Sequence, residues 1–204
     1  MTSFSSALVP MLAPDIDTDQ IIPGPYSHRA DAEGLLEGLF HEARVRDPDF
    51  ILSRPSVRGR SIILAGQNFG CGSAREAAAL ALKANGFRAI IAPSFGQIFR
   101  INCLENGLLP IVVPPRAHKH LRALYERNND SVVTVDLGAG TVSADDGALV
   151  EPITIERFRL NMIAHGLDEL GYLLEQLPAI SRYEESSLVH ESVRSRLGKQ
   201  KILL

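Results

Sequence analysis

The chain has 204 residues, of which 45% are hydrophobic, so it can bury the core of a single domain, which we expect to span residues 1–204. Its formal net charge is −3 and no basic stripe with interleaved aromatic residues is present, which argues against nucleic acid as a partner. No apolar run approaches the ~20 residues that span a bilayer, and the N-terminus lacks the basic start of a signal peptide. We therefore expect a cytoplasmic protein without a membrane partner.

An acidic segment at residues 15–19 comes first in chain order and carries a carboxylate at every second position. An EF-hand loop counted from Asp15 would need glycine at its sixth position and glutamate at its twelfth, where the chain has Gln20 and Tyr26. The calcium interpretation therefore fails. The segment is either a polar turn or a group of carboxylates that orients a cation, for which Arg75 is the candidate.

A glycine-rich turn follows the first predicted strand and precedes the first predicted helix. The run Ser61–Ala65 is typical of a buried strand, and Ala77–Lys83 is rich in the strong helix formers alanine and leucine. Glycine permits positive φ and close approach of a ligand, and the start of a helix presents unpaired N–H groups. The sequence therefore predicts an anion site in this turn, which contains Gly66, Gly70 and Gly72.

Two interpretations of the residues that open this helix remain possible. Ser73 and Glu76 match the capping box S-x-x-E, which is a common structural device. Arg75 would then lie in the first helical turn, where a cation is unfavourable, and a bound carboxylate would account for it. The donors that cap the helix would also stabilise a serine alkoxide, so the spacing does not separate capping from catalysis.

The next elements continue the alternation of strand and helix. A strand at Phe87–Ala92, a helix at Phe95–Glu105 and a strand at Leu108–Val113 complete a βαβαβ pattern. This order favours parallel strands and places the glycine-rich turn at the carboxyl end of the first of them. Further predicted elements are a helix at His118–Asn128, a hairpin of Val132–Leu137 and Thr141–Ala144, a strand at Ala148–Ile153, a helix from Thr154 to His165 ended by Gly166, and a solvated or frayed basic tail at Arg194–Lys201 within about residues 190–204.

Five motifs in sequence order resemble the small subunit of 3-isopropylmalate dehydratase, and together they cover nearly the whole chain. They are DIDTDQIIP at 15–23, ILAGQNFGCGSARE at 63–76, IIAPSFGQIF at 90–99, ENGLLPI at 105–111 and GLDELG at 166–171. The resemblance implies an α/β fold, a swivelling β/β/α three-layer domain like that of aconitase, with the partly parallel βαβαβ core. It also implies a heterodimer whose large subunit carries a 4Fe-4S cluster. The two would interconvert 2-isopropylmalate and 3-isopropylmalate through 2-isopropylmaleate in leucine biosynthesis.

The same resemblance implies roles for particular residues. Ser73 matches the serine that the aconitase superfamily uses as base, and Arg75 matches its carboxylate-binding arginine. Further substrate-binding or supporting residues are Asp17, Thr18, Asp19, Gly72, Ala74 and Arg29, of which Asp19 would hold the arginine in place. No residue of this chain is expected to bind the metal, because two distant cysteines and scattered histidines do not supply three thiolates.

Departures from the family pattern leave the substrate open. The family reads G-S-S-R-E-H, whereas this chain has Ala74 in place of the second serine and Ala77 in place of the histidine, and the loop at Gly24–Arg29 also differs. The chain could therefore serve a paralogous hydro-lyase for another 2-hydroxy diacid, such as citraconate or methylmalate. It could also be a non-catalytic binding module that keeps the fold. The stoichiometry of the assembly and self-association without the partner are open as well.

Other site types find less support in the sequence. A nucleotide site lacks the P-loop G-K-S and an acidic residue after the second strand. Cys71 and Cys103 form no C-x-x-C, so neither a disulfide framework nor a zinc knuckle is expected. Cys71 is predicted to be a small buried thiol, because no nearby histidine can be assigned as the base that a nucleophilic thiol needs. The pair His118 and His120 is predicted to be exposed and polar.

Overall fold

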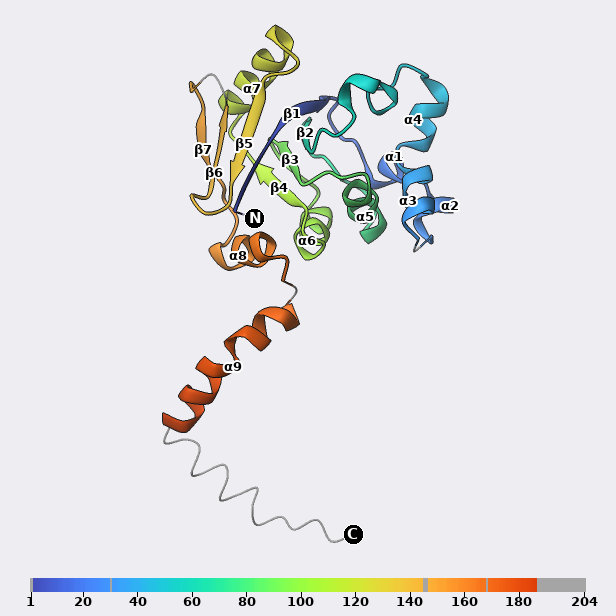
Figure 1. Cartoon of the computed structure of the whole chain (residues 1–204). Coiled ribbons are helices and arrows are strands. Elements are labelled where there is room, and N and C mark those ends of the chain that lie inside the picture. The colour runs from blue at the N-terminus through green and yellow to red at the C-terminus, as the bar shows by residue number, and fades with distance from the viewer. Residues whose placement is uncertain (1, 30, 145–146, 168, 187–204) are drawn as a thin grey trace, which may run out of the picture. The chain divides into compact units, whose positions relative to one another are not determined.

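The computed structural model describes residues 2–29, 31–144, 147–167 and 169–186 (Figure 1). Its contacts divide the chain into two units, Met1–Gly166 and Leu167–Leu204. The first unit contains the sheet and the candidate site, and the described part of the second contains helix α9, Glu169–Ser186. One domain over residues 1–204 stays a prediction, and the predicted basic tail at 194–201 lies outside the described residues.

A seven-stranded sheet organises the first unit in the order β4-β3-β2-β1-β5-β6-β7. Strands β1 to β4 pair in parallel, whereas β1 pairs antiparallel with β5, which continues antiparallel to β6 and β7. The α/β class with a partly parallel core is therefore confirmed, as is the hairpin. The strands are β1 (Ser3–Met11), β2 (Ile62–Ala65), β3 (Ala89–Ala92), β4 (Leu109–Val112), β5 (Val132–Asp136), β6 (Thr141–Ala144) and β7 (Val150–Pro152).

The predicted βαβαβ pattern corresponds to β2, α5 (Glu76–Ala84), β3, α6 (Gln97–Glu105) and β4. Every residue of β2 and β3 is buried, as expected for parallel strands that are covered on both faces. Helix α7 (Pro115–Arg127) begins earlier than predicted because proline is favourable at the first helical position, where its missing N–H has no partner to lose. Helix α8 (Arg157–His165) ends at Gly166, as predicted, with φ of 67° at that glycine.

The central strand β1 was not among the predicted elements. Its residues Ser3–Ala7 pair with β5, and its residues Leu8–Met11 pair with β2, so it joins the antiparallel and parallel halves of the sheet. Short helices between β1 and β2 were not predicted either. They are α1 (Thr18–Ile21), α2 (Gly24–Ser27), α3 (Ala32–Gly38) and α4 (His41–Arg46), followed by the 3₁₀ turns η1 (Ile51–Ser53) and η2 (Pro55–Val57).

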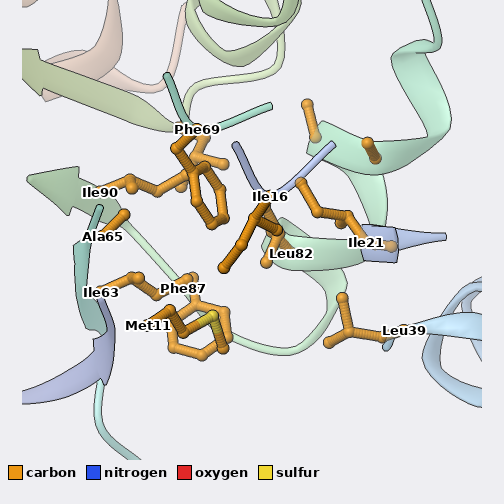
Figure 2. Packing of buried hydrophobic residues seen from close by; sticks show 14 of the residues in the cluster. Met11, Ile16, Ile21, Leu39, Ile63, Ala65, Phe69, Leu82, Phe87 and Ile90 are labelled. Atoms are coloured by element: carbon orange, nitrogen blue, oxygen red, sulfur yellow. The ribbon is translucent and has the colours of Figure 1, made fainter. Parts of the chain in front are cut away.

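Two hydrophobic clusters cover opposite faces of the parallel strands. On one face, side chains of β1 to β3 pack against α5 and the short helices; Figure 2 shows this cluster around Met11, Ile63, Phe69, Leu82 and Ile90. On the other face, alternate residues of the same strands pack with α7, α8 and the antiparallel strands, including buried valines of β5 and β6. The antiparallel half thus supplies a second β layer, in agreement with the predicted β/β/α arrangement.

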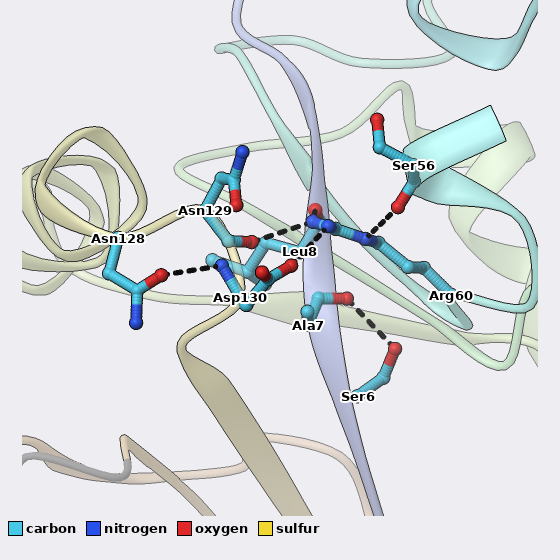
Figure 3. A network of polar contacts seen from close by, with 8 residues as sticks. All are labelled: Ser6, Ala7, Leu8, Ser56, Arg60, Asn128, Asn129 and Asp130. Atoms are coloured by element: carbon cyan, nitrogen blue, oxygen red, sulfur yellow. Dashed lines mark hydrogen bonds and ion pairs between the residues drawn. The ribbon is translucent and has the colours of Figure 1, made fainter. Parts of the chain in front are cut away.

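Arg60 ties the start of β2 to β1 and to the loop before β5 (Figure 3). Its side chain is only 8% exposed and forms an ion pair of 2.8 Å with Asp130. The guanidinium also donates to the carbonyl oxygens of Leu8 at 2.8 Å, Asn129 at 2.7 Å and Ser56 at 3.0 Å. One cation therefore satisfies main-chain acceptors from three separate segments, two of which are distant in sequence.

Arg60→Met is expected to lower the free energy of unfolding by about 1–3 kcal/mol, because it removes a largely buried cation that donates to the partly buried carbonyl of Leu8 and to two exposed carbonyls. Chemical denaturation monitored by circular dichroism measures the loss. The matched control is Arg122→Met, which removes an exposed pair with Glu126 on α7 and should cost less than about 0.5 kcal/mol. Equal losses in both variants would contradict the structural role of Arg60.

A candidate active site at the glycine-rich turn

The glycine-rich turn connects the carboxyl end of β2 to α5, where the sequence places it. Gly70 has φ of 73°, and a Cβ there would lie 2.2 Å from the ring of Phe99 on α6. Gly72 has φ of 91°, in the region that side chains of L residues rarely adopt. Glycine is therefore required at Gly70 by both backbone conformation and close packing, and at Gly72 by conformation.

The acidic N-terminal segment lies alongside this turn, although some fifty residues separate them in sequence. The N–H of Gly70 donates to the carbonyl of Ile16 at 2.7 Å, and the N–H of Thr18 donates to the carbonyl of Cys71 at 2.9 Å. Asp17 and Cys71 form an isolated parallel bridge between these contacts. Main-chain hydrogen bonds thus fix the two segments against each other, so side chains of both reach one site.

The carbonyl oxygen of Ser73 accepts two hydrogen bonds. Thr18 is fully buried, and its Oγ1 donates to the carbonyl of Ser73 at 3.0 Å. The N–H of Arg75 donates to the same carbonyl at 2.8 Å. Ser73 itself is exposed. The predicted serine is therefore presented to solvent on a backbone that Thr18 anchors to the protein interior.

The predicted capping box is wrong. Helix α5 begins at Glu76, and its N-cap is Arg75, which makes no side-chain capping bond. Ser73 does not occupy the capping position, because its carbonyl oxygen accepts a hydrogen bond from Thr18 and the chain turns at Gly72. The carboxylate of Glu76 instead accepts a hydrogen bond of 3.0 Å from Nδ2 of Asn106 at the end of α6. Arg75 accordingly precedes the first helical turn.

Arg75 forms an ion pair with Asp19, the third carboxylate of the acidic segment. The side chains are 32% and 54% exposed, respectively, so the pair is open to solvent and to a ligand. Asp17 plays another part, because it is the N-cap of α1 and accepts from the N–H of Gln20 at 2.7 Å. Of the acids considered as partners for Arg75, Asp19 is thus the one that contacts it.

A hollow of about 360 Å³ lies beside Arg75 and brings the loop after α2 to the start of α5. Arg29 lines the hollow too and forms an ion pair of 2.6 Å with Glu37. Gly34 lets the Arg29 stem lie close, because a Cβ at that position would be 2.3 Å from its Cδ. The lining residues are Ser27, His28, Arg29, Arg75, Glu76, Ala77 and Leu80. The predicted residues Gly72, Ser73 and Ala74 are exposed on the adjoining turn and do not line it.

The cysteines and histidines differ from expectation in detail. Cys71 is partly exposed, and burial raises the pKa of its thiol, with the carboxylates of Asp15 and Asp17 adding to the effect. A raised pKa lowers the thiolate fraction and makes a nucleophilic role unfavourable. His118 and His120 are both half-buried, and Nε2 of His118 lies 2.8 Å from the Ala65 carbonyl oxygen, so the prediction of an exposed pair is wrong. Among the described residues, no group of three or more His, Cys, Asp or Glu is placed to hold a metal ion.

Comparisons with known proteins identify the family. The aconitase C-terminal domain family matches residues 10–116. A 3-isopropylmalate dehydratase small subunit from Roseiflexus sp. (strain RS-1) is 45% identical, over 88% of this chain and 90% of its own length. The chain belongs to the 3-isopropylmalate dehydratase small-subunit family. A member from Solibacter usitatus is 43% identical over 91% of this chain and 93% of its own length.

The fold agrees with a solved member of this family. The crystal structure of 3-isopropylmalate dehydratase (leuD) from Methanocaldococcus jannaschii matches with a TM-score of 0.65 and 28% identity, over 88% of this chain and 98% of that one. The predicted fold class, family and hydro-lyase class, and the link to leucine biosynthesis that follows from the enzyme name, are thereby confirmed. In the described part of the chain, no helix combines the length and apolar character needed to cross a bilayer.

Thr18→Val is expected to lower the free energy of unfolding by about 1 kcal/mol, because the shape is kept while the Ser73 carbonyl loses its buried donor. In the assembled enzyme the same change should lower kcat more than it raises KM, since the serine backbone loses its anchor. Denaturant titration and steady-state kinetics measure the two effects. Wild-type kinetics in a variant with the expected loss of stability would show that Thr18 does not position Ser73.

Proposed function

We propose that this chain is the small subunit of a heterodimeric 3-isopropylmalate dehydratase, which interconverts 2-isopropylmalate and 3-isopropylmalate through 2-isopropylmaleate. Membership in the small-subunit family supports the activity and the need for a large subunit. The observation that carries the proposal is the exposed Ser73, held by Thr18 next to the Arg75–Asp19 pair. The cytoplasmic location belongs to the same proposal.

Moving a hydroxyl group between adjacent carbons requires a base for the C–H bond, a Lewis acid for the departing hydroxide and clamps for two carboxylates. In this proposal the Oγ of Ser73 accepts the proton, and the guanidinium of Arg75 binds a carboxylate. Arg75 and the start of α5 also place positive charge close to Ser73, which favours the alkoxide that the reaction needs. Asp19 keeps the guanidinium oriented, and Arg29 is a second cation on the adjoining hollow.

The residues of this chain do not fit an iron–sulfur cluster. Only Cys71 and Cys103 could offer thiolates, and burial strongly raises the pKa of Cys103, which lies in the core on α6. We therefore propose that the large subunit holds a 4Fe-4S cluster, which supplies the Lewis acid. The contribution of this chain is confined to proton transfer, carboxylate binding and the shape of the site.

Ala74 favours one further candidate, a paralogous hydro-lyase that acts on another 2-hydroxy diacid. The side chain at this exposed position offers no donor to a carboxylate, so substrate contacts differ from those of a family member with serine there. Arg29 could replace the missing donor, since it lines the hollow together with Arg75. The third candidate, a non-catalytic binding module, predicts an assembled complex without turnover.

Co-expression with a candidate large subunit under anaerobic conditions tests the proposal. Turnover of 2-isopropylmalate, citraconate and citrate is measured on the purified complex after the cluster content has been determined by absorbance and iron analysis. We expect 2-isopropylmalate to give the highest kcat/KM and the isolated chain to be inactive. Preference for another diacid would support the paralogous hydro-lyase, and an intact cluster without turnover of any diacid would support the binding module.

A further inference from the structure

Two non-glycine residues at the candidate site have left-handed backbone conformations. Asp15 has φ of 55° and Asn68 has φ of 58°, although a Cβ makes this region unfavourable for L residues. The two side chains contact each other, because Nδ2 of Asn68 donates to Oδ1 of Asp15 at 2.7 Å. Unfavourable backbone conformations persist where surrounding contacts hold them, and they are concentrated at functional sites. The pair is therefore a candidate for a role in the site.

Asn68 connects the glycine-rich turn to the segments on both sides of it. On one side, besides the amide contact, the N–H of Asp15 donates to the carbonyl of Gln67 at 2.9 Å. On the other side, the N–H of Asn68 donates to Oγ of Ser94 at 2.9 Å, and the N–H of Phe69 donates to the Ser94 carbonyl at 3.2 Å. Ser94 lies between β3 and α6. Asn68 is thus the point where the acidic segment, the turn and this connection meet.

The side-chain amide distinguishes position 68 from the other left-handed positions of the turn. Gly70 and Gly72 also have positive φ, and glycine would adopt the conformation of Asn68 without strain. Backbone conformation alone therefore does not account for an asparagine here. Its amide donates to a charged acceptor, and such a hydrogen bond is stronger than one between neutral groups and offsets part of the strain.

The contact between Asp15 and Asn68 lies at the start of both segments that carry the candidate reacting groups. The two segments run parallel from this contact, as their isolated bridge shows. The acidic segment supplies Asp19, which holds Arg75, and the turn leads to Ser73. A shift of one segment along the other would therefore change how the guanidinium is held relative to the serine. Since a misplacement of about 1 Å can cost roughly 10²-fold in rate, the register of the two segments matters for catalysis.

We propose that Asn68 is a positioning residue of the active centre. Its amide binds Asp15 and thereby fixes the register of the acidic segment against the glycine-rich turn, so that Ser73 and Arg75 meet the substrate in one geometry. The inference rests on the proposed function and adds a residue that acts through Asp15, not on the reacting atoms. Asn68 does not line the hollow beside Arg75.

The first test compares Asn68→Gly and Asn68→Ala in the complex with the large subunit. Both remove the amide, so kcat for 2-isopropylmalate should fall about 10-fold in each while KM changes less than about threefold, because the arginines that bind the carboxylates are kept. Only alanine keeps a Cβ at positive φ, so Asn68→Ala should unfold at a lower temperature than Asn68→Gly. Steady-state kinetics normalised to cluster content and thermal unfolding curves measure the two effects. Equal losses of kcat at unequal stability would separate positioning from stability.

The second test exchanges the two side chains. Asn68→Asp sets two carboxylates against each other, and the resulting displacement should lower kcat by about 10-fold or more. Combining this change with Asp15→Asn restores a hydrogen bond between an amide and a carboxylate, and both residue types tolerate the left-handed conformation. The exchange variant should return kcat to within about threefold of the wild type, as expected for residues that act as a coupled pair.

The matched control is Ser5→Ala, which removes an exposed side-chain hydrogen bond of 2.7 Å with Thr134 in the antiparallel half of the sheet. Wild-type kcat is expected in this variant. With an active wild type, an undiminished kcat in Asn68→Gly, or an exchange variant no more active than Asn68→Asp, would overturn the positioning role and leave the proposed function standing. A wild-type complex that is inert toward every diacid would overturn both.

Discussion

Ser73→Ala in the assembled enzyme is expected to lower kcat by about 10²–10⁴-fold, the contribution typical of a positioned general base. KM should change little, because the serine hydroxyl acts on a C–H bond and the carboxylates are bound by arginine. The fold should be kept, since Ser73 is exposed and Thr18 contacts its carbonyl oxygen, not its side chain. Steady-state kinetics with 2-isopropylmalate, together with a thermal unfolding curve, measure the effect.

The matched control for this prediction is Ser53→Ala, which removes another exposed serine hydroxyl from the turn η1. Wild-type kcat is expected in that variant. Equal turnover by Ser73→Ala and the wild type would remove this serine from the mechanism. A loss of kcat that is matched by Ser53→Ala would indicate a general effect on the complex.

Arg75→Lys is expected to raise KM by roughly 10- to 100-fold, which corresponds to about 1.5–3 kcal/mol for a hydrogen bond to a charged group. Lysine keeps the charge but has neither the planar fork that binds a carboxylate bidentately nor the rigid geometry that Asp19 orients. Because the substrate carboxylate is present throughout the reaction, most of the loss should appear in KM and less in kcat.

The control for this second prediction is Arg122→Lys, a charge-conserving change in an exposed ion pair on α7. It should leave both kinetic constants unchanged. Asp19→Asn should raise KM by a smaller factor than Arg75→Lys, since the guanidinium remains but is less firmly held. An Arg75→Lys enzyme with wild-type KM would show that Arg75 does not bind the substrate carboxylate.

The parallel core could be predicted because its strands are buried on both faces and therefore appear as short apolar runs bounded by glycine or proline. Strand β1 lacks this pattern, since Ser3, Ser5 and Ser6 lie in its first half and Pro10 lies near its end. Its strand conformation depends on pairing with both β2 and β5, and these contacts are distant in sequence. Local pattern therefore could not identify the strand that joins the two halves of the sheet.

In the candidate site, too, some features could be predicted from neighbouring residues and others depend on contacts distant in sequence. Pairing of an acid with Arg75 could be predicted from charge, and Asp19 fulfils it. The serine at position 73 matched a capping box by spacing, but Thr18 binds its carbonyl and moves it off the helix. Leu80 was missed because an apolar residue on a helix is typical of a core, and only the fold places it in the lining of the hollow beside Arg75.

The most direct test of a shared active centre is the structure of the complex with the large subunit and a bound diacid. We expect Ser73 Oγ to lie within hydrogen-bond reach, about 2.6–3.2 Å, of the reacting position or one water away, with Arg75 on a substrate carboxylate. A complex in which both side chains lie far from the diacid and from the metal of the large subunit would contradict a shared centre.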